Sequence, residues 1–140
     1  MATASDFHDK GFNCAESTLQ GLAEYLGVQN ELLPQIATGF GGGVGHTGRI
    51  CGAISGAVMA LGIKYGRRDP QDKKTRDELY QRVEAFLKKV GEKLGHTDCI
   101  DLIGVPLNTE EGLKIYRQNH LRDKCHTIIQ TVEDLAKEFL

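Results

Sequence analysis

Apolar residues recur three and four positions apart along much of the chain, which is the spacing of a helix that buries one face. This spacing predicts a helix over about Asn13 to Leu26, where Gly27 suits its end. A charged amphipathic helix is predicted over about Gln71 to Leu94, and a last helix over about Leu121 to Phe139. No alternating run bounded by hairpin turns is present, so no strand is predicted.

Shorter segments complete the predicted order. A short helix is expected around Glu31 to Thr38, with Pro34 in its first turn, and another at Cys99 to Ile103. Six glycines fall between Gly39 and Gly48, which predicts an irregular loop. The segment from Arg49 to Gly62 is small or apolar on every side, which is typical of a helix buried all round. We therefore expect one all-α domain over residues 1–140, a compact helical bundle around this glycine-rich central helix.

Composition and charge narrow the function classes. The chain has 140 residues, 17 basic and 19 acidic side chains, and a net charge of -2, so nothing points to nucleic acid. The N-terminus has no basic and apolar leader, and the longest apolar run, Ile50 to Ile63, is shorter than the roughly 20 residues that span a bilayer. We expect a cytoplasmic protein without membrane insertion. In the reducing cytoplasm, the presence of four cysteines favours metal binding or catalytic redox chemistry over permanent disulfides.

The four cysteines each belong to a separate predicted helix, and no two form a Cys-x-x-Cys pair. Cys14, Cys51 and Cys99 are expected at helix starts, where free amides and the helix dipole favour a thiolate, whereas Cys125 lies within the last helix. His46 and Arg49 add positive charge near Cys51. Cys51 is therefore the expected reactive thiolate. The alternative is that these are ordinary buried cysteines.

Glycines near the cysteines suggest close approach of backbone to sulfur. Gly42 and Gly43, in the loop, are expected to bring backbone N–H groups toward a thiolate or a cluster sulfur. A flexible connector is the equally weighted alternative for this loop, which lacks a complete phosphate-binding motif. Gly52 and Gly56 form a one-turn ridge on the central helix, which leaves space for another backbone or a cofactor.

These residues resemble one known family. The sequence is similar to the C_GCAxxG_C_C family of redox-active proteins in the segments Gly11 to Glu16, Gly39 to Gly45, Cys51 to Gly56 and Cys99 to Gly104, and at Cys125. The resemblance covers nearly the whole chain and implies a redox role without naming a substrate. A looser resemblance to the iron–sulfur portion of split-Soret cytochromes implies a cluster as cofactor. The chain has no Cys-x-x-Cys-His, so covalent haem is not expected.

Three functions follow as hypotheses. The first is ligation of an iron–sulfur cluster by Cys14, Cys51, Cys99 and Cys125, for electron transfer or redox sensing with an unidentified redox partner protein. The second is metal-free thiol–disulfide chemistry of an oxidoreductase type, with Cys51 and Cys14 as candidate reacting residues. The third is a structural zinc-binding or helical interaction module, for which a homodimer remains open. The two redox hypotheses need the cysteines to share a site, so we expect the four sulfurs to converge in one pocket.

Overall fold

The computed structural model describes residues 1–140, and it is built of helices without strands. This confirms the predicted all-α class. In chain order the elements are α1 (Ala4–Asp9), α2 (Cys14–Leu26), the 3-10 helix η1 (Gln35–Phe40), α3 (Gly41–Val44), α4 (Gly52–Tyr65), α5 (Lys73–Leu94), α6 (Cys99–Ile103), α7 (Glu110–Gln118) and α8 (Leu121–Lys137).

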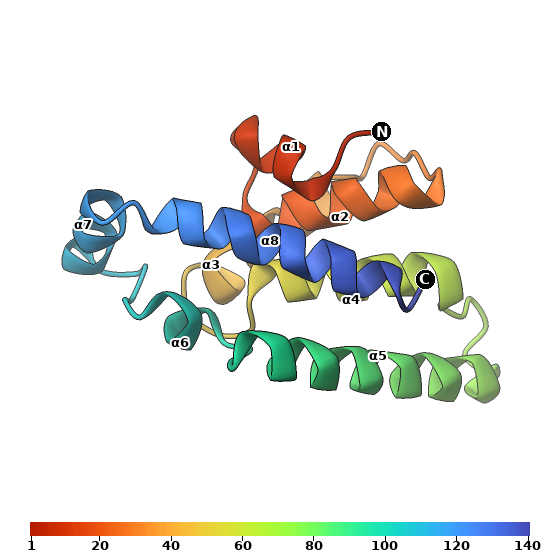
Figure 1. Ribbon diagram of the computed structural model, residues 1–140. Coiled ribbons are helices and arrows are strands. Elements are labelled where there is room, and N and C mark those ends of the chain that lie inside the picture. Colours follow the sequence, from red (N-terminus) through yellow and green to blue (C-terminus); the bar gives the residue numbers. More distant parts are fainter.

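Three helices begin at the same end of the bundle. Helices α2, α4 and α8 run side by side in one direction, and α5 runs back along them in the opposite direction (Figure 1). Helices α6 and α7 lie at the end where α2, α4 and α8 begin, and α1 packs across α2 and α8. Because three cysteine-bearing helices start at this end, their N-terminal dipole ends point toward a common region.

Helix α4 lies at the centre of the molecule, as predicted. No residue between Gly52 and Leu61 is exposed. At Gly56, an added Cβ would lie 2.6 Å from the carbonyl oxygen of Ala15 and 3.1 Å from the backbone nitrogen of Leu19. The two glycines of the ridge therefore let α4 pack directly on the backbone of α2, since any side chain would separate the helices.

The other predicted segments are present in the structure, but some differ in their boundaries or in the type of helix. Helices α2, α5, α6 and α8 occupy the predicted segments within a few residues. The central helix begins at Gly52 rather than Arg49, because residues 48–51 pair with residues 97–100 instead. The helix expected at Glu31 to Thr38 is instead the 3-10 helix Gln35–Phe40. The glycine loop contains the short α3, whose Gly42 and Gly43 have φ values of 65° and 70° and so depart from regular helix.

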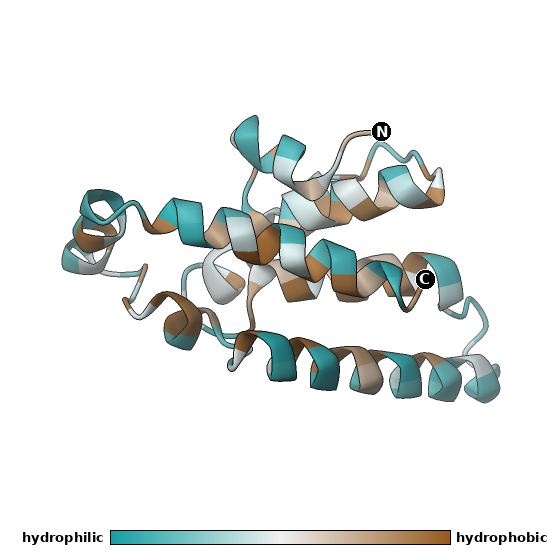
Figure 2. Cartoon of the chain, in the orientation of Figure 1, coloured by the Kyte–Doolittle hydropathy of each residue, from teal (hydrophilic) through white to brown (hydrophobic).

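Two short helices, α1 and α7, were not predicted from the sequence. Helix α1 carries a capping box in which Thr3 accepts from the backbone N–H of Asp6 and the Asp6 carboxylate accepts from the N–H of Thr3. Helix α7 is capped by Thr109 and begins with two acidic residues. Both have largely hydrophilic surfaces, and apolar colour concentrates on the inner faces of the longer helices (Figure 2). No helix combines the length and apolar character required to traverse a bilayer.

Candidate cysteine site

The cysteines occupy the positions predicted for them. Cys14 and Cys99 are the first residues of α2 and α6, and Cys51 is the N-cap residue of α4. Cys125 lies one turn into α8. The start of α2 is fixed by a capping box, in which the Asn13 side chain accepts from the N–H of Glu16 and the Glu16 carboxylate accepts from the N–H of Asn13.

Backbone hydrogen bonds hold Cys51 and Cys99 beside one another. The N–H of Cys51 donates to the carbonyl of Thr97 at 2.8 Å, and the N–H of Cys99 donates to the carbonyl of Arg49 at 2.7 Å. A β-bridge between Ile50 and Asp98 lies between these bonds. The two cysteines are 48 positions apart in sequence, so this short ladder is what brings the starts of α4 and α6 together.

All four cysteines line one cavity, as the sequence analysis expected. The rest of its wall is glycine and aliphatic carbon, from Gly52, Leu102, Ile103, Ile128 and Ile129. Little of the space between these side chains is wide enough to admit a water molecule. Four thiols thus face each other in apolar surroundings, with no lysine, arginine, histidine or carboxylate among the lining residues.

Two of the three glycines predicted to lie beside cysteines do so, namely Gly43 and Gly52. A Cβ added at Gly52 would collide with the sulfur of Cys14, and one added at Gly43 would lie 2.7 Å from the Cβ of Cys99. Gly42 instead faces the ring of His46. Neither Gly42 nor Gly43 lines the cavity, so the cofactor-binding role expected for them stays a prediction.

The expected low thiol pKa of Cys51 is wrong in direction. Burial, with smaller contributions from the charges of Cys14 and Cys99, raises the pKa of Cys51 to about 12. The backbone N–H groups of Ala53 and Ile54 oppose this shift, as a helix start should, but they do not overcome the desolvation. The sequence places Cys51 at a helix N-terminus, whereas only the packing shows that the residue is 7% exposed.

Two other cysteines show the same effect. Burial raises the pKa of Cys99 to about 12, with further contributions from the charges of Cys14 and Cys125. Burial likewise raises the pKa of Cys125, while a hydrogen bond from Tyr116 lowers it. The thiols are therefore close enough to oppose each other's ionisation, and several thiolates can coexist here only beside compensating positive charge.

Tyr116 on α7 is a site residue that the sequence analysis missed. Its hydroxyl donates to the sulfur of Cys125 at 3.6 Å. It precedes Cys125 by nine positions and lies on another helix, so no local pattern links the two. The signal that could have revealed α7 is Thr109 followed by Glu110 and Glu111, which is typical of a helix start.

His126, next to Cys125 in sequence, belongs to a different cluster. Its Nδ1 lies 3.0 Å from Nδ1 of His8 and 3.7 Å from a carboxylate oxygen of Asp9. Adjacent helix residues point in different directions, so His126 faces α1 and not the cysteine cavity. His8 is buried, and burial lowers its pKa to about 4.

The four cysteines form a donor set that suits a metal centre. Four thiols on separate elements match the number and softness of ligands that iron–sulfur clusters and zinc use. However, no three histidine, cysteine, aspartate or glutamate side chains already surround a single point closely enough to hold one ion. The chemistry of the residues fits a thiolate-ligated group, and binding of one remains a proposal.

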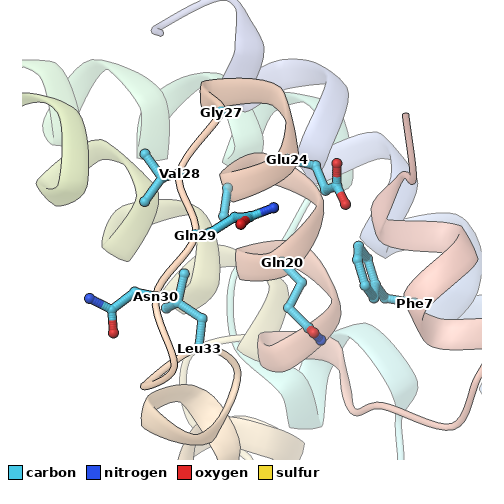
Figure 3. A pocket seen from close by; sticks show the side chains of 9 residues that line it. Phe7, Gln20, Glu24, Gly27, Val28, Gln29, Asn30 and Leu33 are labelled. Atoms are coloured by element: carbon cyan, nitrogen blue, oxygen red, sulfur yellow. The ribbon is translucent and has the colours of Figure 1, made fainter.

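A second, more open pocket lies away from the cysteines. It is formed beside α1, the later part of α2 and the chain that follows α2 (Figure 3). Its polar side chains are amides and one carboxylate, namely Gln20, Gln29, Asn30 and Glu24. This set contains no metal-binding cluster and no nucleophile, so the cysteine cavity remains the candidate site.

Comparisons with known proteins agree with the importance of the four cysteines. Residues 12–139 match the family model described as "Putative redox-active protein (C_GCAxxG_C_C)". An Archaeoglobus fulgidus protein described as "Uncharacterized protein" is 32% identical over 97 residues, and the alignment spans 64% of each chain. No solved structure gives a significant match.

Proposed function

Because this chain belongs to the C_GCAxxG_C_C family of redox-active proteins, we propose that its four cysteines bind an iron–sulfur cluster that transfers electrons or senses redox state. One observation carries the proposal. Cys14, Cys51, Cys99 and Cys125 come from four different elements, yet all line a single cavity whose other walls are glycine and aliphatic side chains. A metal centre in this cavity would meet four cysteine sulfurs and no other side chain able to coordinate it.

The electrostatics of the cavity support a metal-bound form. Burial and mutual proximity raise the pKa values of Cys51, Cys99 and Cys125. Metal cations reverse this, since coordinated thiols are deprotonated outright and the cation balances their charge. Zinc would satisfy the same ligands but has no redox chemistry, so a redox-active family favours iron.

The residues around the cavity have definable tasks. A bound iron–sulfur cluster supplies one-electron redox chemistry. Cys51 and Cys99 would hold it from the backbone ladder between residues 48–51 and 97–100, while Cys14 and Cys125 would hold it from α2 and α8. Leu102, Ile103, Ile128 and Ile129 would exclude water, which influences the reduction potential of a buried centre.

The test is a set of four single Cys→Ser variants purified without oxygen. We expect the parent to contain iron and inorganic sulfide with visible absorbance, and each variant to lose most of it, because serine lacks the soft sulfur. Ile128→Val is the matched control, since it trims the cavity wall without removing a sulfur. A parent that contains stoichiometric zinc, or no metal at all, would contradict the proposal.

Thiol–disulfide chemistry is the second candidate, favoured by the closeness of Cys14 and Cys51, which line the same cavity. Oxidation would form one S–S bond between two thiols and release two protons and two electrons to a disulfide substrate, which becomes two thiols. In that case at least one Cys→Ser variant should retain full activity toward a disulfide substrate. Loss of metal in all four variants, with no reactive thiol pair in the parent, would exclude it.

A further inference from the structure

One of the four cysteines has a neighbour that the others lack. Tyr116 is half-buried on α7, and its hydroxyl donates to the sulfur of Cys125 across 3.6 Å. Sulfur hydrogen bonds are longer than those to oxygen, and the structure shows no other hydrogen bond made by this hydroxyl. Tyr116 packs against the small apolar cluster formed by Cys99, Ile103 and Leu107.

The hydroxyl of Tyr116 is suited to be a permanent donor. An ordinary phenol has a pKa of about 10, so the hydroxyl keeps its proton near neutral pH. The ring is also held in place, because α7 is capped by Thr109 and because Gly112 lies directly against the carbonyl of Pro106. A donor with a fixed position and a fixed proton favours negative charge on the sulfur that accepts from it.

We propose that Tyr116 is a positioning residue, which orients the sulfur of Cys125 toward the cavity and stabilises negative charge on that sulfur. The functional effect of this hydrogen bond rests on the proposed function. If Cys125 ligates a cluster, a hydrogen bond to its sulfur raises the reduction potential of that cluster. Among the four proposed ligands, only Cys125 accepts a hydrogen bond from a side chain on the peripheral helix α7.

The decisive variant is Tyr116→Phe, which keeps the ring and removes the donor. In iron-loaded protein, the midpoint potential should shift to a more negative value. In metal-free, reduced protein, alkylation of Cys125 by iodoacetamide at one fixed pH should slow about three-fold, because losing a charge-assisted hydrogen bond lowers the thiolate fraction more than it raises the nucleophilicity of the remaining thiolate.

Cys99 provides an internal control, since it packs in the same cluster without receiving this bond. Peptide mapping of the alkylated protein separates the two cysteines. If Tyr116 merely fills space, its replacement loosens the cluster and both cysteines react faster. Slower reaction at Cys125 with unchanged reaction at Cys99 supports the proposal, and an unchanged or faster reaction at Cys125 overturns it.

Tyr80→Phe is the matched control variant, because Tyr80 is 63% exposed on α5 and contacts no cysteine. It should leave both the potential and the alkylation rates unchanged. The metal-free measurement needs no cluster, so it decides the role of Tyr116 even if the protein binds no iron. Failure of the proposed function and failure of this inference are therefore distinguishable.

Discussion

The molecule has two apolar regions of very different size, and the cysteines are divided between them. The main core is a cluster of 18 buried residues that includes Cys51, with Cys14 packed against it. The small cluster consists of three buried residues, Cys99, Ile103 and Leu107, with Cys125 packed against it. The cavity lies at the boundary, so two sulfurs belong to each region.

This division indicates how the site combines rigidity with access. Opening the main core exposes many buried side chains and costs most of the stability of the protein, whereas opening the small cluster exposes few. We therefore expect Cys14 and Cys51 to be fixed whenever the protein is folded. Cys99 and Cys125 should become accessible through local opening of α6 and α7, which is the route by which a metal would enter.

The largest effect should come from the contact between α2 and α4 in the main core. Gly56→Val places a side chain against the carbonyl oxygen of Ala15, which is backbone and cannot yield without parting the helices. We expect the free energy of unfolding to fall by about 3 kcal/mol or more, as measured by urea denaturation. Gly62→Val is the control in the same helix, since nothing lies within 4 Å of its added Cβ. Equal losses in both variants would show that helix propensity and not the close approach is responsible.

Cavity-creating changes should distinguish the two regions directly. Leu22→Ala in the main core should cost about 3 kcal/mol of global stability, and Leu107→Ala in the small cluster about 2 kcal/mol. Only Leu107→Ala should accelerate alkylation of Cys99 in native protein, because it lowers the cost of local opening. Leu32→Ala, at an exposed position, should change neither quantity. If Leu22→Ala exposed Cys99 equally well, the two regions would open as one unit.

Acid should weaken the edge of the main body where α1 meets α8. The pKa of His8 is about 4 in the folded protein, lowered by burial and by the charges of Arg122 and His126, while Asp9 partly opposes this. The unfolded chain takes up a proton near pH 6.5, so stability is lost as pH falls from about 6.5 to about 4. Between pH 7.5 and pH 5 the loss from this group should be about 2 kcal/mol.

Urea denaturation of the parent and of His8→Gln at both pH values measures this contribution. The variant should lack the His8 part of the pH dependence, and His120→Gln, at an exposed position, should retain it. An identical pH dependence in the parent and in His8→Gln would refute the assignment. Alkylation of Cys99 should not follow the same pH profile, since the small cluster does not contact His8.

Helix caps should give the smallest effects. Asn13→Ala removes the cap of α2, and Thr109→Ala removes the cap of α7; each should cost about 1 kcal/mol. The first loss should appear in global unfolding. The second should appear mainly as faster exchange of the amide protons of α7 and as an altered reactivity of Cys125, through Tyr116. Global destabilisation by Thr109→Ala that exceeds the loss in Asn13→Ala would contradict the division into two regions.

The sequence was sufficient for features that depend on neighbours along the chain. The apolar stripe and Gly27 define α2, and the run of small residues identifies α4 as the central helix. The positions of three cysteines at helix starts could be predicted because caps and glycine loops are local signals. The same local logic could have found α7 from Thr109. Local signals were insufficient at η1, where a 3-10 helix over Gln35–Phe40 replaces the helix expected around Glu31 to Thr38.

Tertiary structure decided what depends on distance through space. Helix position alone favours an ionised Cys51, yet desolvation in the packed interior reverses the direction of its pKa shift, and no sequence pattern reports burial of that kind. Convergence of the four sulfurs requires the pairing of residues 48–51 with residues 97–100 and the parallel course of α2, α4 and α8. The hydrogen bond from Tyr116 to Cys125 joins two helices across a turn. The first two depend on packing between segments far apart in the sequence, and the third depends on how α7 folds against α8; local periodicity constrains these contacts but does not specify them.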